Sequence, residues 1–369
     1  MMKKVAFVRG TGIYNDSRST KEILALVEAG YLVEVLCWDR DGNASTKCKE
    51  TFVDVLDKVN FSFYSVPAEN GIGLKNINKL IGWFRWVVKT LKNSGELKAV
   101  HACDLDSGIP ARKYCKRRKV KLVYDIFDYY VDSHHIPSIM SKMVENMEIK
   151  VINFASVTII CTEERVEQIA KAKPQKVIVI HNSPEMDTLS ESEIDTDYFY
   201  CGAMAGKRLI VEILGEYKEN SDLKVTFAGY GPYSLKAEEI SKQYENFSFL
   251  GALSYSQVLS LEARSRVLAA IYEPTVRNHR LCAPNKFYEA LALGKPVIVC
   301  KGTGIDKIVE ENDIGCVINY DAGEFYFAVR KLCNSENYQQ MGVRARKLYV
   351  EKYDWKIMKG ILVSAYGEL

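Results

Sequence analysis

The sequence predicts an α/β protein made of two Rossmann-like, doubly wound domains that face each other across a cleft. Short runs rich in β-branched and aromatic residues alternate with helical patterns along nearly the whole chain. Several of these runs are apolar on both faces, which is typical of a parallel sheet covered by helices. The alternation breaks once, at residues 183–197, so the 369 residues divide into two domains of ordinary size.

The first series predicts an N-terminal domain over residues 1–182. Its predicted strands are residues 4–9, 32–38, 61–66, 99–103, 121–127, 157–162 and 176–182. The stretch that follows, SPEMDTLSESEIDTD, is acidic, rich in serine and without apolar periodicity. We interpret this stretch, residues 183–197, as the linker between the domains.

The second series predicts a C-terminal domain over residues 198–352. Its predicted strands are residues 198–204, 223–229, 247–252, 267–272, 296–300 and 316–320. Residues 353–369 form a last amphipathic helix, which we expect to pack back on the first domain. Ligands of doubly wound sheets bind beyond the carboxyl ends of the strands, so functional residues are expected in the loops there.

Composition and charge favour a cytoplasmic protein. The ten cysteines include no CxxC pair, so neither a zinc cage nor a redox dithiol is indicated, and a reducing compartment fits. The apolar run near the N-terminus is too short for a signal sequence, and no run approaches the roughly 20 residues that span a bilayer. Residues 1–185 carry 28 basic and 22 acidic side chains against 22 and 25 in the remainder, so the excess positive charge lies in the first half.

The stretch APNKFYEALALGKPVIV, residues 283–299, indicates a nucleotide site. Pro284 and Asn285 precede a helix that is predicted to start near Lys286, and the free N–H groups of such a helix start bind anions. Lys286 adds a full positive charge. Glu289, one turn later, is placed to accept hydrogen bonds from paired hydroxyls such as those of a ribose. A phosphate and a ribose together describe a nucleotide.

The same stretch, continued as PNKFYEALALGKPVIVCKGTGIDKIVEENDIGCVI, resembles the C-terminal signature of family 4 glycosyltransferases, which are retaining enzymes of the GT-B fold. In that family two glutamates contact the donor. The resemblance places Glu289 at the second glutamate, which contacts the ribose, whereas the first position, eight residues earlier, is Leu281 here. Lys286 and Asn285 are carried over as donor-site residues.

Two further segments of the C-terminal domain resemble the family. YFYCGAMAGKRLIVEIL, residues 198–214, matches the segment that binds the donor diphosphate; the first family arginine is Ala203 here, and Arg208 with Lys207 beside it takes the later basic position. FAGYGPY, residues 227–233, matches the turn near the nucleotide base, which assigns Gly229 and Gly231 to the donor.

The N-terminal domain resembles the family more loosely. In RGTGIYNDSR, residues 9–18, Gly12 is expected near the donor phosphates, and Asn15 and Arg18 are expected to bind the acceptor. AVHACDLDSGIPAR, residues 99–112, adds His101 and Asp104 as acceptor residues, with Cys103 at a family histidine.

LVYDIFDYYVD, residues 122–132, aligns with a strand that usually ends in a histidine contacting the transferred sugar. That position is Phe127 here, and Asp128, His134 and His135 are the alternatives; Asp128 is the one assigned to catalysis.

The resemblance implies transfer of a hexosyl group with retention, from a nucleotide-diphosphate sugar to a glycan or lipid-linked acceptor in cell-surface polysaccharide synthesis. The departing phosphate must be stabilised by fixed positive groups, and Arg208, Lys286 and a helix start supply these without a metal ion or another cofactor. Two alternatives stay open. One is a non-catalytic glycosyltransferase-like subunit that supports an active partner, and the other is a nucleotide-sugar epimerase of the same architecture.

Competing motifs carry less weight. Asp-Leu-Asp at 104–106 has the spacing of a metal site in the other glycosyltransferase fold, but two successive βαβ series argue against that fold, and no Gly-x-Ser-x-Gly supports a hydrolase. Nucleic acid is not expected, because no aromatic platform accompanies the basic residues.

Two basic segments are compatible with binding to an anionic membrane surface, on the inner face of the cell membrane. Residues 74–93 have an apolar helical stripe that we expect to be buried, which leaves Trp83, Trp86 and several lysines on the other side. The expected stripe is Leu74, Ile77, Ile81, Phe84, Val88 and Leu91. Residues 111–121 hold seven basic side chains. A solvated charged face is the alternative interpretation of both segments.

Overall fold

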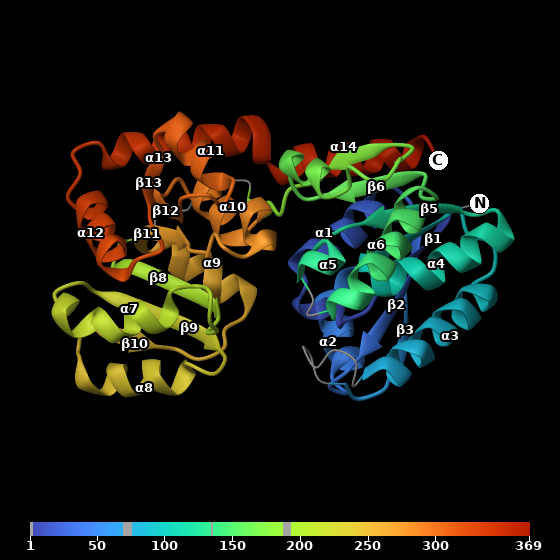
Figure 1. Cartoon of the computed structure of the whole chain (residues 1–369), viewed down its shortest axis with the longest axis horizontal. Helices are drawn as coiled ribbons and strands as arrows, with labels where there is room; N and C mark the ends of the chain where they lie inside the picture. The colour runs from blue at the N-terminus through green and yellow to red at the C-terminus, as the bar shows by residue number, and fades with distance from the viewer. Residues whose placement is uncertain (1–2, 69–75, 134–135, 187–192) are drawn as a thin grey trace. The chain divides into compact units, whose positions relative to one another are not determined.

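The structure, a computed structural model, describes residues 3–68, 76–133, 136–186 and 193–369, without the side chain of Asn15. It divides into two compact units. The first unit comprises Met1–His181 together with Met358–Leu369, and the second comprises Asn182–Ile357. Each unit holds one parallel sheet between helices (Figure 1).

The first sheet has the strand order β3-β2-β1-β4-β5-β6-β7, and all of its neighbouring strands are parallel. The strands are β1 (Lys4–Arg9), β2 (Leu32–Asp39), β3 (Val59–Ser65), β4 (Ala99–Cys103), β5 (Lys121–Asp125), β6 (Val157–Ile160) and β7 (Val177–Val179). After β3 the chain crosses back to place β4 on the other side of β1. The carboxyl ends of β1 and β4 therefore flank the point where the winding direction reverses, which is where such sheets bind ligands.

Helices cover both faces of the first sheet. They are α1 (Ser17–Glu28), α2 (Ala44–Thr51), α3 (Ile77–Asn93), α4 (Asp104–Arg118), α5 (Tyr130–Ser133), α6 (Ser138–Ile152) and, from Met358, α14 (Trp355–Gly367). Helices α3, α4 and α6 pack side by side as one layer (Figure 1). No helix in the described part of the chain is long and apolar enough to cross a bilayer.

The buried face of α3 differs from the predicted stripe. Ile77 and Ile81 are 44% and 41% exposed, whereas Trp83 is fully buried. The helix is turned because its bulkiest side chain fills the core: Trp83 stacks on Trp38 with 5.8 Å between ring centroids, and its Nε1 donates to the carbonyl of Asp106 at 3.1 Å. The expectation that Trp83 lies on the outer face is wrong. Leu74 lies outside the described residues.

The second sheet has the order β10-β9-β8-β11-β12-β13 and is also parallel throughout. Its strands are β8 (Thr196–Ala203), β9 (Val225–Tyr230), β10 (Phe247–Phe249), β11 (Ser265–Ala270), β12 (Val297–Cys300) and β13 (Gly315–Ile318). Here the winding reverses between β8 and β11. Each strand of both sheets overlaps a strand that the sequence predicts, and the doubly wound α/β class is confirmed.

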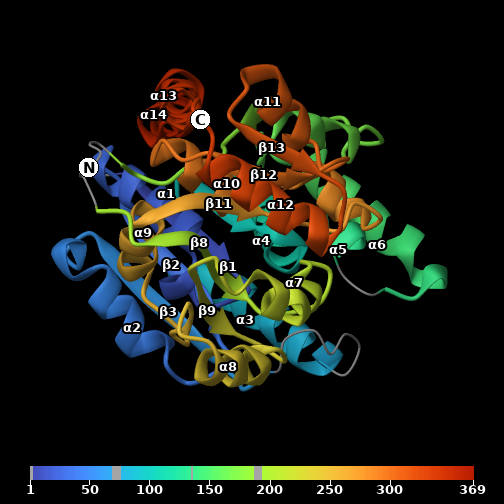
Figure 2. The ribbon, with the colours of Figure 1, turned by 90° about the vertical axis from the view of Figure 1, so that its left-hand side faces the viewer.

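The helices of the second unit are α7 (Ile210–Glu216), α8 (Ser234–Gln243), α9 (Tyr255–Ala263), α10 (Asn285–Ala292), α11 (Ile305–Asn312), α12 (Ala322–Cys333) and α13 (Tyr338–Leu348). Helices α7, α8 and α12 bury their apolar sides in one core cluster. On the other side α9 packs on β8 and α10, and α10 packs on β11, as can be followed in Figure 2. Helix α10 carries Lys286 and Glu289 of the candidate site.

Candidate functional site

The carboxyl ends of β8 and β11 gather four polar side chains of the second unit. Tyr200 lies near the end of β8, Arg208 follows that strand, Tyr272 follows β11, and Lys286 stands on α10. The guanidinium carbon of Arg208 lies 5.1 Å from the ring centroid of Tyr272, and Nζ of Lys286 lies 5.2 Å from that of Tyr200. The sheet topology thus brings Arg208 and Lys286 together where a ligand is expected.

The backbone around Arg208 is held in an unusual conformation. Lys207 and Leu209, on either side of it, have φ values of 67° and 58°, in the left-handed region that non-glycine residues rarely adopt. Two hydrogen bonds fix this loop: the N–H of Glu273 donates to the carbonyl of Lys207 at 3.1 Å, and the N–H of Leu209 donates to the hydroxyl of Tyr320 at 2.6 Å. Such strain persists where the surroundings impose it, and here it directs the guanidinium toward Tyr272.

Helix α10 supplies Lys286 from its first turn. The helix begins at Asn285 after an extended Pro284, and no side chain caps its first N–H groups. Asn285 is exposed, and Lys286 is half-buried. A Cβ on Gly202 would come within 3.1 Å of Nζ of Lys286, so the missing side chain at Gly202 leaves the space that the ammonium uses.

The two cations are not held in salt bridges by the part of the chain that the structure describes. Among the described residues no carboxylate forms an ion pair with Arg208 or Lys286. Burial by itself lowers the pKa of Lys286, but Tyr200, Tyr272 and Glu289 outweigh burial and raise it, so the ammonium stays protonated. Two half-buried positive charges that no salt bridge compensates are costly, and a bound anion with several oxygens would relieve that cost.

The glycine turn after β9 lies against the same loop. Gly229 and Gly231 have φ values of 129° and 142°, and a Cβ on either would overlap a carbonyl oxygen, of Gly202 and Met204 respectively. The N–H of Met204 donates to the carbonyl of Tyr230 at 2.8 Å. The predicted donor glycines therefore lie beside the residue that makes room for Lys286.

Glu289 lies one turn beyond Lys286 and is 3% exposed. Glu262, which is 1% exposed and stands on α9, is a neighbour of Glu289, because Glu289 adds to the rise that burial causes in the pKa of Glu262. Sequence reasoning did not single out Glu262, Tyr200 or Tyr272. The two tyrosines could have been found from their positions at predicted strand ends, whereas Glu262 sits inside a helix and gave no such signal.

In the first unit, Asp104 organises the carboxyl ends of β1, β4 and β5. Arg9 at the end of β1 pairs with Asp104 and, at 3.0 Å, with Asp16. Oδ1 of Asp104 accepts from the N–H groups of Phe127 and Asp128 at 3.0 and 3.3 Å. Burial raises the pKa of Asp104 to about 6, with Arg9 opposing the rise. This carboxylate is occupied by the protein's own groups.

Phe127, at the position where the family usually has a histidine, lies between two guanidinium groups. The guanidinium carbons of Arg9 and Arg18 lie 4.0 and 4.9 Å from its ring centroid. Asp128, the predicted catalytic carboxylate, has a half-exposed side chain that accepts from Arg165 at 3.3 Å. Its assignment to catalysis remains a prediction.

Arg18 and His101 belong to a buried network. Arg18 donates to both carboxylate oxygens of Asp125, at 2.8 and 3.2 Å, and its Nε lies 3.2 Å from Oε1 of Glu22. His101 is fully buried, and its Nδ1 lies 2.9 Å from the hydroxyl of Tyr366. Because Arg18 is only 6% exposed and already engaged, we replace the predicted acceptor role of Arg18 and His101 with a structural one.

The protonation states of this network follow from burial. Although burial opposes ionisation, Arg18 and His101 hold the pKa of Asp125 below its ordinary value. Burial and the neighbouring Asp125 raise the pKa of Glu22, and burial lowers that of His101. The network therefore holds one ion pair, Arg18 with Asp125, and two groups that stay neutral.

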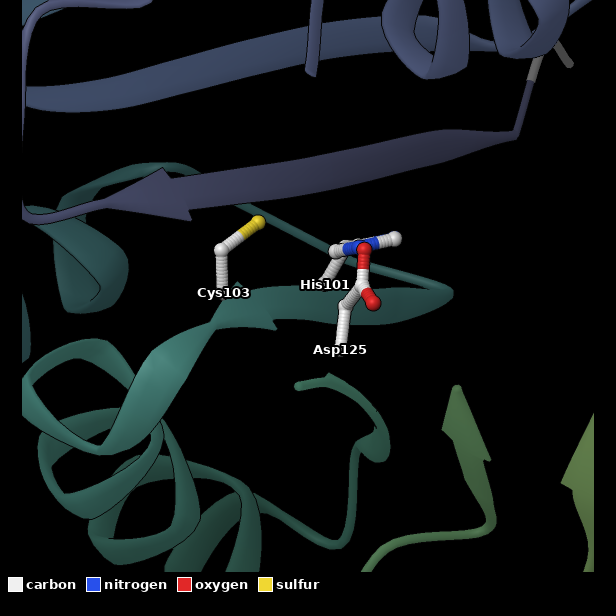
Figure 3. A group of neighbouring side chains, drawn as sticks. All are labelled: His101, Cys103 and Asp125. Atoms are coloured by element: carbon white, nitrogen blue, oxygen red, sulfur yellow. The ribbon is translucent and has the colours of Figure 1, made fainter. Parts of the chain in front are cut away.

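His101, Cys103 and Asp125 offer donor atoms within 4.8 Å of one another, a spacing that a metal ion could use (Figure 3). The chemistry of the three groups does not favour a metal. Asp125 is paired with Arg18, and burial raises the pKa of Cys103, which keeps its sulfur a thiol rather than a thiolate ligand. The cluster is better described as part of the buried network.

The remaining predicted residues are placed as follows. Lys207 is exposed next to Arg208, and Gly12 is half-buried in the loop after β1. Asn15 belongs to the turn Ile13–Asn15, with its side chain outside the described residues, as are His134 and His135. The residues that the structure brings together in the second unit are Arg208, Lys286, Glu289, Gly229 and Gly231.

Comparisons with known proteins agree with this architecture. The chain is similar over 99% of its length to 98% of sucrose-phosphate synthase from Thermosynechococcus elongatus, with a TM-score of 0.72 and 14% identity. It is similar over its full length to all of Anabaena HepE in a complex with UDP and glucose, with a TM-score of 0.71 and 14% identity. The chain has the GT-B fold.

A comparison with protein-family models identifies one domain within this fold. Residues 197–335 match the family model described as glycosyl transferases group 1. No curated protein matches the chain. The matched residues run from the second residue of β8 through β13 and include Arg208, Lys286 and Glu289.

Proposed function

We propose that this protein is a retaining family 4 glycosyltransferase, which moves a hexosyl group from a nucleotide-diphosphate sugar to a glycan or lipid-linked acceptor in cell-surface polysaccharide synthesis. One observation carries the proposal: Arg208 and Lys286 meet at the switch point of the second sheet, and neither forms a salt bridge with any of the described residues. The group 1 model over residues 197–335 and the complex of HepE with UDP-glucose support a nucleotide-sugar donor.

In the proposed reaction the bond between the anomeric carbon and the diphosphate oxygen breaks. The acceptor oxygen forms its bond to that carbon on the same face of the sugar, and its proton passes to the departing phosphate. Negative charge builds up on the diphosphate, where Arg208, Lys286 and the N–H groups at the start of α10 stabilise it. Glu289 holds the ribose, and the turn at Gly229 and Gly231 lies beside the nucleotide. This scheme needs no metal ion.

A second candidate is a non-catalytic subunit with the same fold. Phe127 favours it, because the ring lies between Arg9 and Arg18 and a phenyl group neither donates nor accepts a proton. Ala203 and Leu281 replace two further polar positions of the family. Arg208 and Lys286 oppose this candidate, because burying two positive charges destabilises the protein unless an anion binds to them.

The first experiment is a calorimetric titration of the purified protein with UDP, GDP, dTDP and their sugar conjugates, with Glu289→Ala as the control. Saturable binding of one nucleotide, weakened by the substitution, supports the donor site and names the donor class. Transfer of a labelled sugar to a glycan or lipid acceptor then separates an enzyme from a binding subunit. An epimerised sugar without an acceptor identifies an epimerase, and no binding of any nucleotide contradicts the donor site.

The surface of the first unit supports a peripheral position of the protein on the inner face of the cell membrane. The layer of α3, α4 and α6 exposes basic side chains and apolar ones next to each other. The exposed basic residues at the end of α4 are Lys113, Lys116, Arg117, Arg118 and Lys119. On α6, Ile139 is 90% exposed, and Met143 and Met147 follow at one-turn spacing with 47% and 40% exposed. Basic and apolar groups on one layer are the composition that binds anionic lipid.

A further inference from the structure

The loop that follows β11, residues 271–284, contacts two other loops of the second unit. At its start the N–H of Glu273 donates to the carbonyl of Lys207 at 3.1 Å. Near its end the carbonyl oxygen of Arg280 lies so close to Gly304 that a Cβ on this glycine would come within 2.9 Å of it. The loop is therefore held at both ends, and its first part lies beside the candidate site.

His279 lies in this loop and contacts the same tyrosine as Arg208. Its imidazole meets the ring of Tyr272 edge to face, with 5.1 Å between the ring centroids and 74° between the ring planes. The guanidinium carbon of Arg208 also lies 5.1 Å from the ring centroid of Tyr272. The three side chains form one continuous cluster, so a nucleotide sugar bound to Arg208 is long enough to reach His279.

One hydrogen bond decides which nitrogen of His279 can meet a ligand. Nδ1 lies 3.0 Å from the carbonyl oxygen of Glu273. Because a carbonyl only accepts, Nδ1 carries the proton, and Nε2 of the neutral ring is an acceptor. Among the described residues Nε2 has no hydrogen-bond partner, and the side chain is half-buried. Nε2 is thus the nitrogen that a ligand can use.

The charges around His279 select the kind of ligand group that suits Nε2. Burial lowers the pKa of His279, and Arg208 and Lys207 lower it further, whereas the carbonyl and the carboxylate of Glu273 oppose the shift. The ring therefore stays neutral. A phosphate oxygen accepts hydrogen bonds and suits Arg208 and Lys286, whereas a hydroxyl group can donate and suits Nε2.

The strand order indicates which hydroxyl groups lie near His279. The turn at Gly229 and Gly231 follows β9, on one side of β8, and His279 follows β11, on the other side. Arg208 follows β8 itself, between these two positions. A donor with its base near the glycine turn and its diphosphate at Arg208 therefore has its sugar at the end of β11.

We propose that His279 is a further donor-binding residue, whose Nε2 accepts a hydrogen bond from a hydroxyl group of the transferred sugar. This inference rests on the proposed function, which places the diphosphate at Arg208 and Lys286. The contact involves the sugar alone. It should therefore add to the affinity for a nucleotide sugar and leave the affinity for the free nucleotide unchanged.

The test uses two substitutions that each replace one nitrogen of the ring. The amide of His279→Asn reaches the position of Nδ1 and can still donate to the carbonyl of Glu273, whereas the longer His279→Gln places its amide near the position of Nε2. We expect His279→Asn to bind UDP-glucose, or the nucleotide sugar that the first titration selects, about five- to tenfold more weakly than the wild type. Its affinity for the free nucleotide should not change. We expect His279→Gln to bind the nucleotide sugar within about threefold of the wild type. Gln243→Ala, which changes an exposed side chain on α8, is the control.

Monodeoxy analogues of the donor sugar identify the hydroxyl group that is bound. The wild type should bind one analogue about five- to tenfold more weakly than the parent nucleotide sugar. His279→Asn should show no such difference for that analogue, because the contact is already lost.

Two results would overturn the sugar contact. One is a His279→Asn protein that binds the nucleotide sugar like the wild type. The other is an equal loss of affinity for the free nucleotide and the nucleotide sugar, which would show that His279 only supports Tyr272 and Arg208. If the wild type binds no nucleotide at all, the proposed function fails instead, so the two failures are distinguishable.

Discussion

Gly202 and Lys286 share one space: a Cβ on Gly202 would lie 3.1 Å from Nζ of Lys286, closer than side chains normally approach. Gly202 has φ 152° and is the last residue but one of β8, from which the loop to Arg208 departs. The position of the ammonium therefore depends on the absence of a side chain on the neighbouring strand.

Gly202→Ala should move Lys286 and weaken nucleotide binding by about tenfold, since a charge displaced from the diphosphate loses most of its hydrogen bonding. Some loss of folding stability accompanies it, because alanine disfavours this φ. Calorimetry with the donor nucleotide measures the effect. Gly215→Ala is the control, because a Cβ there makes only an ordinary contact, 3.6 Å from Nζ of Lys236. Equal affinity in a folded Gly202→Ala protein would separate Lys286 from the diphosphate.

Arg208→Ala should reduce the rate of sugar transfer about a hundred- to a thousandfold, or about 2–4 kcal/mol of transition-state stabilisation. The guanidinium acts on charge that develops on the leaving diphosphate, so kcat should fall more than the affinity for the donor. The control is Arg344→Ala on α13, which removes an arginine that pairs with Asp313 and should leave the rate unchanged. Unchanged turnover in folded Arg208→Ala would exclude Arg208 from the mechanism.

Arg18→Leu should destabilise the first unit by about 3–5 kcal/mol, because it leaves Asp125 buried and unpaired. The double variant Arg18→Leu with Asp125→Leu should lose less than Arg18→Leu alone, since no buried charge remains. Urea unfolding measures both, with the exposed Arg118→Leu as the control. A double variant that is less stable than the single one would show that the pair contributes more than mutual neutralisation.

The strands were predictable because a parallel sheet covered by helices needs runs of residues that are apolar on both faces. Such runs can be recognised in the sequence without any knowledge of tertiary contacts. The start of α10 was predictable for a similar reason, since proline and asparagine end the preceding loop. The rotation of α3 about its own axis was not predictable. Ile81 and Trp83 are both apolar, and only the packing of Trp83 on Trp38 decides which of them is buried.

The candidate site was predictable as far as local patterns reach. Lys286 and Glu289 lie three residues apart, so their shared helix face follows from the sequence. Glu262 and Glu289 lie far apart in the chain, and only the packing of α9 on α10 brings them together. Arg18 and His101 show the reverse error: their residue types suggested a ligand, but tertiary contacts with Asp125 and Tyr366 use them inside the core.

Glu148 should make the stability of the first unit depend on pH. It is fully buried on α6 and accepts from the hydroxyl of Tyr124 and the N–H of Tyr130. Burial raises its pKa to about 8, so the folded state binds a proton that the unfolded state has lost above about pH 4.5. The free energy of unfolding therefore falls as pH rises from 4.5 to 8 and levels off above 8.

Glu148→Gln removes that titration. The stability of the wild type relative to Glu148→Gln should decline by up to roughly 4 kcal/mol between pH 5 and pH 8. Urea unfolding at several pH values measures it, and the difference cancels other groups that titrate in this range. Glu145→Gln on the same helix, whose carboxylate pairs with Lys171, is the control. Parallel curves for the wild type and Glu148→Gln would contradict the buried proton.

The layer of α3, α4 and α6 should bind vesicles that contain anionic lipid. Each basic side chain near such a surface contributes about 1 kcal/mol, and that contribution is screened by salt. The exposed Ile139 and Met143 on α6 then add apolar contact. Co-sedimentation with phosphatidylglycerol vesicles, and none with phosphatidylcholine vesicles, is the expected result.

Paired substitutions separate the two contributions to membrane binding. Ile139→Asp with Met143→Asp should weaken vesicle binding at every salt concentration, because the apolar contact is not screened. Arg117→Ala with Arg118→Ala should weaken it only at low salt. Phe327→Asp, which changes a 70% exposed side chain on α12 of the second unit, is the matched control. If the Ile139 and Met143 pair binds like the wild type, the exposed stripe of α6 does not enter the lipid, and the basic residues alone account for the attraction.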